Sequence, residues 1–310
     1  MAFKDPDIGA FREMWKRRAA ARGKYTLAEQ RVYFDNEMGA IPVAAGCSTT
    51  ALTLAHVAAE LIQPPTAVPG KVLLYLHGGG YVFGSIRSHR HLVSRLAVAA
   101  CVRAIHLDYR LAPEHRFPAQ LEDASRAYKQ LLSDGYPRDS ILVGGESAGG
   151  NLAVALCLKL RDESVPQPAG LYLLSPWLDM TTTSESYKTL SARDPILTAQ
   201  GNAGAAAAFL GETPDNFYTS PVRADLTGLP PVLIQVGTEE ILLSDSTTFA
   251  GRAAMAGNEV RLHVWPEMPH VWPLLHFAIR AGLTAIDEAG QWMQERLGIA
   301  SQRVQGPALT

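Results

Sequence analysis

A serine between two glycines, in Gly145-Glu146-Ser147-Ala148-Gly149, is the residue of this chain best placed for nucleophilic chemistry. The apolar run 141–143 before it predicts a strand, and residues 149–161 predict a helix. In this strand–turn–helix setting the pattern GxSxG is typical of a nucleophile elbow, which exposes a serine hydroxyl at a helix N-terminus. Ser147 is therefore the candidate nucleophile. The alternative is a glycine-rich turn whose serine only caps the helix.

A second candidate motif is His77-Gly78-Gly79-Gly80, which follows a predicted strand over 71–76. Successive glycines leave backbone N–H groups uncovered, and acyl transfer needs such donors for its oxyanion. We expect the N–H groups of Gly78, Gly79 and Ala148 to form this oxyanion hole. A flexible loop and a phosphate-binding loop are the alternatives. The absence of a Lys-Ser/Thr pair and of GxGxxG spacing argues against nucleotide binding.

A serine nucleophile needs a base, and three histidines follow Ser147 in the chain. His263 falls inside a predicted strand and His276 inside a predicted helix, which favours structural roles for both. His270 lies in a loop after a strand, where loops gather at the active edge of a parallel sheet. The sequence therefore favours His270 as the base.

The acid that would orient this histidine is less narrowly defined. Glu240 follows a predicted strand over 231–236 and can accept a hydrogen bond from an imidazole Nδ1–H. Glu239 and Asp245 are rivals, and acidic residues also suit the first turn of a helix. We expect Glu240 to be the triad acid.

The elements that must position these residues alternate along the chain and predict an α/β fold with a mostly parallel sheet. The apolar runs are nearly continuous, as expected for strands that are covered on both faces. They are 71–76, 103–109, 140–144, 171–175, 231–236 and 260–264. Predicted helices lie between or after them, at 89–100, 119–133, 149–161, 243–255 and 273–297. Residues 49–62 are expected to add two strands at one edge.

Two segments interrupt this alternation and predict a cap over the sheet. Residues 7–38 predict two amphipathic helices, the second opening with a capping box between Thr26 and Glu29. The second segment is an insertion over residues 179–222, and it contains an Ala-rich helix over 199–210 that ends at Gly211. The expected division is 1–45 as the N-terminal part of the cap, 46–178 as the first part of a catalytic domain, 179–222 as the cap insertion, 223–299 as the second catalytic part and 300–310 as a mobile tail.

Composition excludes several other classes of protein. The 310 residues carry 28 basic and 30 acidic side chains and no basic stripe, so neither nucleic acid nor anionic lipid is an expected partner. Three cysteines without CxxC spacing argue against a disulfide scaffold or a zinc module, and no HExxH pattern occurs. We expect no metal and no cofactor. No apolar run reaches the roughly 18 to 20 residues of a membrane span, and we see no signal peptide, so a cytoplasmic location is expected.

Together these motifs resemble the bacterial hormone-sensitive-lipase-like (family IV) carboxylesterases of the α/β-hydrolase superfamily, over about residues 40–297. The resemblance rests on 77–84, on 109–123 with Tyr-Arg-Leu-Ala-Pro-Glu-His, on 145–151, on Ser175-Pro176-Trp177 and on the loop around His270. It implies the α/β-hydrolase fold with an eight-stranded sheet and a helical cap. It also implies Ser147 as nucleophile and His270 as base.

The sequence departs from the family pattern at two positions. Glu240 occupies the place of the usual aspartate of the triad, and Glu146 stands where aspartate or threonine is commoner, with no expected consequence for the chemistry. A segment rich in polar side chains is expected to form a buried network that shapes its loop rather than to take part in catalysis. Its members are Arg110, Glu114, His115 and Asp123.

The resulting expectation is hydrolysis of small carboxylic esters with short acyl chains through an acyl-enzyme. The residues expected to line the substrate pocket are Tyr81, Phe83, Trp177, Tyr187, Phe209 and Leu210. A catalytically inactive small-molecule receptor on the same fold is one alternative, and amide or thioester hydrolysis is another. Exposed sheet edges also permit a homodimer.

Overall fold

A central sheet of eight strands organises the computed structural model, which describes residues 8–9, 12–13, 15 and 25–300. The first of the two helices expected over 7–38 falls largely outside these residues, as does the expected tail. The strands are β1 (Ser48–Leu54), β2 (Val57–Gln63), β3 (Val72–Leu76), β4 (Arg103–Leu107), β5 (Ile141–Glu146), β6 (Gly170–Leu174), β7 (Val232–Gly237) and β8 (Val260–Trp265). Their order across the sheet is β1-β2-β4-β3-β5-β6-β7-β8.

The sheet is parallel from β4 to β8, and β1 and β2 join it antiparallel at one edge. This agrees with the α/β fold class, the eight strands and the two early edge strands predicted from the sequence. Because parallel strands run in the same direction, their carboxyl ends meet at one edge of the sheet.

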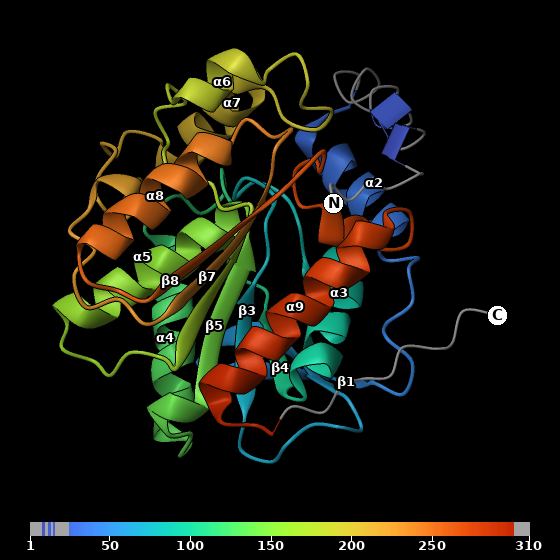
Figure 1. Cartoon of the computed structure of the whole chain (residues 1–310), viewed down its shortest axis with the longest axis vertical. Helices are drawn as coiled ribbons and strands as arrows, with labels where there is room; N and C mark the ends of the chain where they lie inside the picture. Colours follow the sequence, from blue (N-terminus) through green and yellow to red (C-terminus); the bar gives the residue numbers. More distant parts are fainter. Residues whose placement is uncertain (1–7, 10–11, 14, 16–24, 301–310) are drawn as a thin grey trace.

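Helices cover both faces of the sheet (Figure 1). On one face lie α3 (Ile86–Ala100) and α9 (Arg280–Leu297), and on the other lie α4 (Ala119–Ser133), α5 (Ala148–Asp162) and α8 (Leu243–Met255). The side chains of β3, β5, β6 and β7 are accordingly buried along their whole length. The continuous apolar runs of these strands therefore reflect cover on both faces.

The last strand differs from this expectation. β8 lies at the edge of the sheet and pairs with β7, and its residues 261–263 are exposed. Cover on both faces was predicted for it, and that prediction is wrong because little packs against its outer part.

The helix predicted over 273–297 is also interrupted. A short 3-10 helix, η3 (Trp272–Leu275), is followed by a break before α9 begins at Arg280. Gly282 in the first turn of α9 lies so close to η3 that an added Cβ would sit 3.0 Å from the Cα of His276. The chain folds back on itself here, which a continuous helix would not permit.

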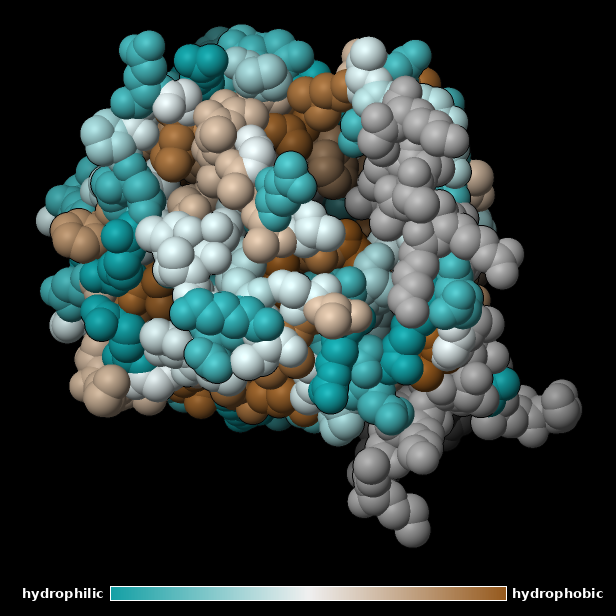
Figure 2. All heavy atoms as spheres, turned by 90° about the horizontal axis from the view of Figure 1, so that it is seen from above, coloured by the Kyte–Doolittle hydropathy of each residue, from teal (hydrophilic) through white to brown (hydrophobic). Residues whose placement is uncertain are grey.

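Above the carboxyl edge of the sheet lie α2 (Leu27–Met38), α6 (Glu185–Thr189) and α7 (Ala199–Leu210), the last two at the top of Figure 1. The capping box of α2 is confirmed, because Thr26 Oγ1 accepts the N–H of Glu29 and the Glu29 carboxylate accepts the N–H of Thr26. Gly211, with φ 59°, ends α7 as predicted. A view onto this upper face shows hydrophobic atoms in recesses between polar side chains (Figure 2).

None of the helices in the described part of the chain is both long and apolar enough to cross a membrane.

Candidate active site

Ser147 occupies a strained turn between β5 and α5. Its φ of 54° and ψ of −120° lie where non-glycine residues are rare, and such strain marks functional turns. The flanking glycines are required by close packing. A Cβ on Gly145 would collide with the carbonyl of Gly149, and a Cβ on Gly149 would collide with the carbonyl of Leu76 at the end of β3. The two glycines of GxSxG are therefore required, because a larger residue would not fit at either position of this turn.

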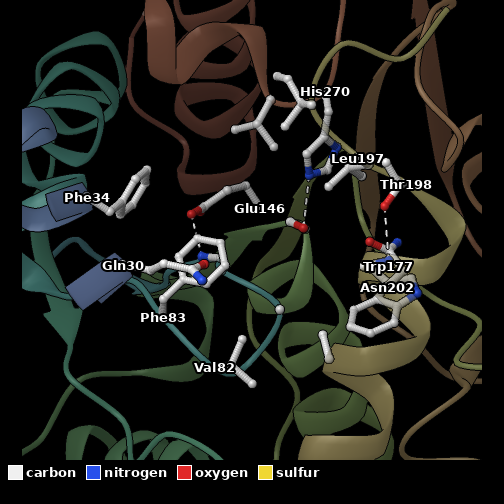
Figure 3. A pocket seen from close by; sticks show the side chains of 18 of the residues that line it. Gln30, Phe34, Val82, Phe83, Glu146, Trp177, Leu197, Thr198, Asn202 and His270 are labelled. Atoms are coloured by element: carbon white, nitrogen blue, oxygen red, sulfur yellow. Dashed lines mark hydrogen bonds between the residues drawn. The ribbon is translucent and has the colours of Figure 1, made fainter. Parts of the chain in front are cut away.

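The structure brings Ser147, His270 and Glu240 together in one chain of hydrogen bonds. His270 Nε2 lies 3.0 Å from Ser147 Oγ, a contact drawn as a dashed line from His270 in Figure 3. His270 Nδ1 lies 2.7 Å from Glu240 Oε2. An ionised carboxylate can only accept, so Nδ1 carries the proton and Nε2 is free to accept from the serine hydroxyl. Ser147 and His270 are both nearly buried, and Glu240 is fully buried.

Glu240 is held in place by two further hydrogen bonds to its other oxygen. Its Oε1 accepts from Gly237 N at 2.7 Å and from Ser175 Oγ at 2.7 Å. Ser175 Oγ in turn accepts the N–H of Val271, the residue after the histidine, at 3.1 Å. Both sides of the Glu240–His270 pair are therefore fixed by neighbouring strand ends.

The two rival acids lie elsewhere. Glu239 forms an ion pair with Arg12 at 2.6 Å. Asp245 accepts the N–H groups of Leu178 and Asp179 at 2.9 and 3.1 Å, so it anchors the start of the 179–222 insertion. Burial raises the pKa of Asp245 to about 8, although these backbone hydrogen bonds oppose the shift.

The other two downstream histidines also lie outside this chain of hydrogen bonds. His263 pairs with Glu288 on the exposed face of β8, with 2.8 Å between Nδ1 and Oε2. His276 Nε2 lies 3.2 Å from His91 Nδ1 in a buried pair. Both placements agree with the structural roles expected for them.

One expected oxyanion donor is already engaged. The N–H of Gly78 donates to Oε1 of the buried Glu146 carboxylate, so this donor does not serve an oxyanion and the expectation for Gly78 is corrected. Within the described residues, no acceptor pairs with the N–H groups of Gly79, Gly80 or Ala148. Gly79 and Gly80 line the cavity together with Ser147, and Ala148 follows Ser147 in the chain. Gly80 was not among the oxyanion donors expected from the sequence.

A cavity of about 740 Å³ opens onto Ser147 and His270. Its lining is mostly apolar, and the described part of it contains no lysine or arginine. Of the six residues expected to line the pocket, Phe83 and Trp177 do so.

The other four predicted pocket residues lie outside the lining, and that expectation is wrong for them. Tyr81 stacks on Phe209 with ring centroids 3.9 Å apart, so both contribute to packing behind the wall. Tyr187 is buried with its hydroxyl on Asn202 Nδ2, at 2.9 Å. Leu210, at the end of α7, packs against the core.

Sequence reasoning missed the residues that cap helices contribute. α2 supplies Leu27, Gln30 and Phe34 to the cavity wall. The segment before α7 and one face of that helix supply another part, made of Ile196, Leu197, Thr198, Gly201, Asn202, Gly204, Ala205 and Ala208. The spacing of the small residues, at 201, 204, 205 and 208, is one helical face and was a signal available in the sequence.

Two buried polar residues behind the site were also missed. Asn151 of α5 accepts from Tyr81 OH at 2.7 Å, and its Nδ2 donates to the carbonyls of Trp177 and Thr219 at 2.7 and 2.8 Å. Asp194 accepts the N–H groups of residues 196, 197 and 241. Burial raises the pKa of Asp194. Both residues tie the insertion to the catalytic loops.

The expected buried network on the loop after β4 is only partly present. Asp123 is buried and binds the guanidinium of Arg110 through both carboxylate oxygens. Glu114 and His115 are exposed, which corrects the expectation for them. Glu114 instead forms a two-pronged ion pair with Arg31 of α2, at 2.8 Å for each contact.

No cluster of three or more histidine, cysteine, aspartate or glutamate side chains in the described residues could hold a metal ion.

Comparison with known proteins agrees with this architecture. The family model for the α/β-hydrolase fold matches residues 73–274. An acetyl-hydrolase of Streptomyces hygroscopicus is 43% identical over 248 residues, which cover 80% of this chain and 83% of the relative. An esterase of Acinetobacter venetianus is 36% identical over 219 residues, which cover 70% of this chain and 72% of the relative.

Solved structures give the same result. A crystal structure of an esterase from the bacterial hormone-sensitive lipase family is 41% identical, with a TM-score of 0.92, and the match covers 96% of this chain and 100% of that one. An esterase/lipase from an uncultured bacterium is 38% identical, with a TM-score of 0.91, and the match covers 94% of this chain and 99% of that one. The chain therefore belongs to the α/β-hydrolase fold family and, within it, to the hormone-sensitive-lipase-like group.

Proposed function

We propose that this protein is a carboxylesterase that hydrolyses small esters through an acyl-enzyme on Ser147. The hydrogen-bond chain from Glu240 through His270 to Ser147, at the floor of a mostly apolar cavity, is the observation that carries the proposal. The family membership of the chain and the names of its relatives, esterase and acetyl-hydrolase, support it.

In the proposed reaction, Ser147 Oγ attacks the ester carbonyl while His270 Nε2 takes its proton. The Glu240 carboxylate holds the Nδ1–H tautomer and stabilises the imidazolium that forms. His270 then gives the proton to the departing alcohol, which leaves an acyl-serine. Water, activated by the same imidazole, attacks the acyl-serine and releases the acid.

Three backbone donors are proposed to hold the oxyanion. These are the N–H groups of Gly79, Gly80 and Ala148, which lack a protein acceptor within the described residues. Donors that are fixed before the reaction need no reorganisation as charge develops, and each contributes about 3 to 4 kcal/mol to transition-state stabilisation. Ala148 is also the first residue of α5, whose N-terminus favours negative charge.

The cavity supports a substrate class as well. With no lysine or arginine in the described lining, the cavity offers no permanent cation to a carboxylate or phosphate on the substrate. Small, uncharged esters with short acyl chains fit its volume and apolar walls. We propose residues 1–45 and 179–222 as the cap that limits acyl length, because α2 and α7 form part of the wall.

The test is hydrolysis of p-nitrophenyl butyrate by the wild type, beside Ser147→Ala and the control Ser246→Ala. Ser246 is also buried, and it lies on α8, outside the cavity lining. We expect activity that is lost only in Ser147→Ala. A folded wild type without activity on acyl chains of any length would favour the receptor alternative. Faster cleavage of a matched amide or thioester would instead favour those reactions.

A homodimer is a separate proposal that rests on β8. Within the part of the chain that the structure describes, this edge strand leaves one row of backbone groups unpaired, and Leu262 on it is exposed. Light scattering coupled to size-exclusion chromatography, with Leu262→Lys as the variant, tests it. A monomeric wild type would refute it.

A further inference from the structure

The carboxylate of Glu146 lies directly beside the nucleophile, yet it takes no part in the proposed triad. It is the last residue of β5, its side chain is 1% exposed, and it also lines the cavity. Its Oε1 lies 3.0 Å from His89 Nε2 and accepts the N–H of Gly78. Figure 3 shows the Glu146 side chain pointing away from His270, toward the side of the cavity with Phe34 and Phe83.

Gly78 is held by hydrogen bonds at both its N–H and its carbonyl oxygen. Glu146 takes its N–H, and His77 Nδ1 lies 2.8 Å from its carbonyl oxygen. Burial lowers the pKa of His77 to about 4, so its ring is neutral at pH 7 and Nδ1–H is the donor. The carbonyl of His77 accepts in turn from the Tyr109 hydroxyl at 2.5 Å.

Space around Gly78 is as restricted as its hydrogen bonding. A Cβ added there would lie 2.9 Å from the Glu146 carbonyl and 3.1 Å from Ser147 Cβ. The glycine loop therefore packs directly on the elbow. The position of Gly78 determines where the next two N–H groups, of Gly79 and Gly80, point.

His89 pairs with this carboxylate, and the pairing makes it compatible with an oxyanion nearby. Burial raises the pKa of the Glu146 carboxyl, but the adjacent His89 ring and the N–H of Gly78 lower it by more, so the net shift is downward. An unpaired negative charge here would oppose the negative charge of the tetrahedral intermediate. The ring of His89 is fixed by Ser88 Oγ, 3.0 Å from Nδ1, and by stacking on His77 at 5.3 Å.

We propose that Glu146 and His89 are positioning residues for ester hydrolysis. Hydrogen-bonded to each other, they hold Gly78 so that the N–H groups of Gly79 and Gly80 face the oxyanion. The inference rests on the proposed function, because it names what orients the oxyanion donors of that reaction.

The test uses Glu146→Ala, Glu146→Gln and the control Asp123→Asn. Asp123 is equally buried and ion-paired, with Arg110, but it is outside the cavity lining. We expect Glu146→Ala to lower kcat on p-nitrophenyl butyrate about 100-fold, the loss typical of a misplaced oxyanion donor, with KM changed less than about twofold. Glu146→Gln keeps an acceptor for Gly78 and is expected to retain about a tenth or more of kcat.

A transition-state analogue separates positioning from a structural role. A trifluoromethyl ketone forms a tetrahedral adduct whose oxyanion needs the same donors, so its Ki should rise in parallel with the loss of kcat. An unchanged Ki, or an unchanged kcat in both Glu146 variants, would overturn the proposal. So would unfolding of both variants, which would assign Glu146 to stability. Activity in the wild type and its loss in Ser147→Ala would leave the proposed function standing in each of these cases.

Discussion

Replacing Glu240 by glutamine tests how the triad histidine is held. The carboxylate has two sets of partners: Gly237 N and Ser175 Oγ on Oε1, and His270 Nδ1 on Oε2. A backbone N–H can only donate, so the glutamine carbonyl must stay on Gly237. The amide NH₂ group then faces His270 Nδ1 and forces the ring into the tautomer with a proton on Nε2.

That tautomer cannot accept the proton of Ser147. Inverting the tautomer in an otherwise intact triad costs about 10⁴-fold in kcat, which corresponds to about 5.5 kcal/mol in the activation free energy. Glu240→Asp keeps the charge but withdraws it from His270. We expect its activity to lie between those of the wild type and Glu240→Gln.

The assay is initial-rate hydrolysis of p-nitrophenyl butyrate at pH 8, with circular dichroism to establish folding. Asp245→Asn is the matched control, because Asp245 is an equally buried acid that contacts the insertion and not the imidazole. A loss of less than about tenfold in folded Glu240→Gln would refute the assigned role. A larger loss in Asp245→Asn would move the role to that residue.

Three further predictions concern stability and selectivity. Burial raises the pKa of Asp245 from 3.8 to about 8, so the folded protein binds this proton more tightly and the free energy of unfolding falls as pH rises from about 4 to 8. Asp245→Asn should flatten that slope in urea titrations, by up to about 1.4 kcal/mol per pH unit, and an unchanged slope would contradict the pKa. Burial lowers the pKa of His106 well below 6.5, so stability should fall as pH drops below about 6.5, and His106→Phe should reduce this loss in thermal melts at pH 7 and pH 5. A Cβ on Gly204 meets open space in the cavity wall, so Gly204→Leu should lower kcat/KM for p-nitrophenyl octanoate about tenfold more than for the acetate. Gly251→Leu, equally unhindered on α8, should change neither rate, and equal effects of the two variants would contradict a wall at α7.

Local signals in the sequence were enough to predict the sheet and the residues that meet at its carboxyl edge. GxSxG after an apolar run marks a turn that only glycine can flank, and His270 was the one downstream histidine predicted to lie in a loop. Continuous apolar runs identified the central strands correctly. The same reasoning failed at β8, because a sequence run carries no information about what packs against it.

The finer details of the site depend on tertiary contacts. An aromatic residue near the active edge can face the cavity, as Phe83 does, or stack behind it, as Tyr81 and Phe209 do. Neither periodicity nor spacing separates these cases. The contact between Glu146 and Gly78 depends on the path of the glycine loop, which the sequence does not show.

Stoichiometric labelling with a p-nitrophenyl phosphonate tests the central claim most directly. The reagent forms a stable tetrahedral adduct on an activated serine and releases p-nitrophenol. We expect one equivalent of p-nitrophenol per protein, complete loss of esterase activity, and a single modified residue, Ser147, in the peptide mass spectrum. Ser147→Ala should release none. Esterase activity that survives full labelling, or a label on another residue, would contradict the assignment of Ser147 as the nucleophile.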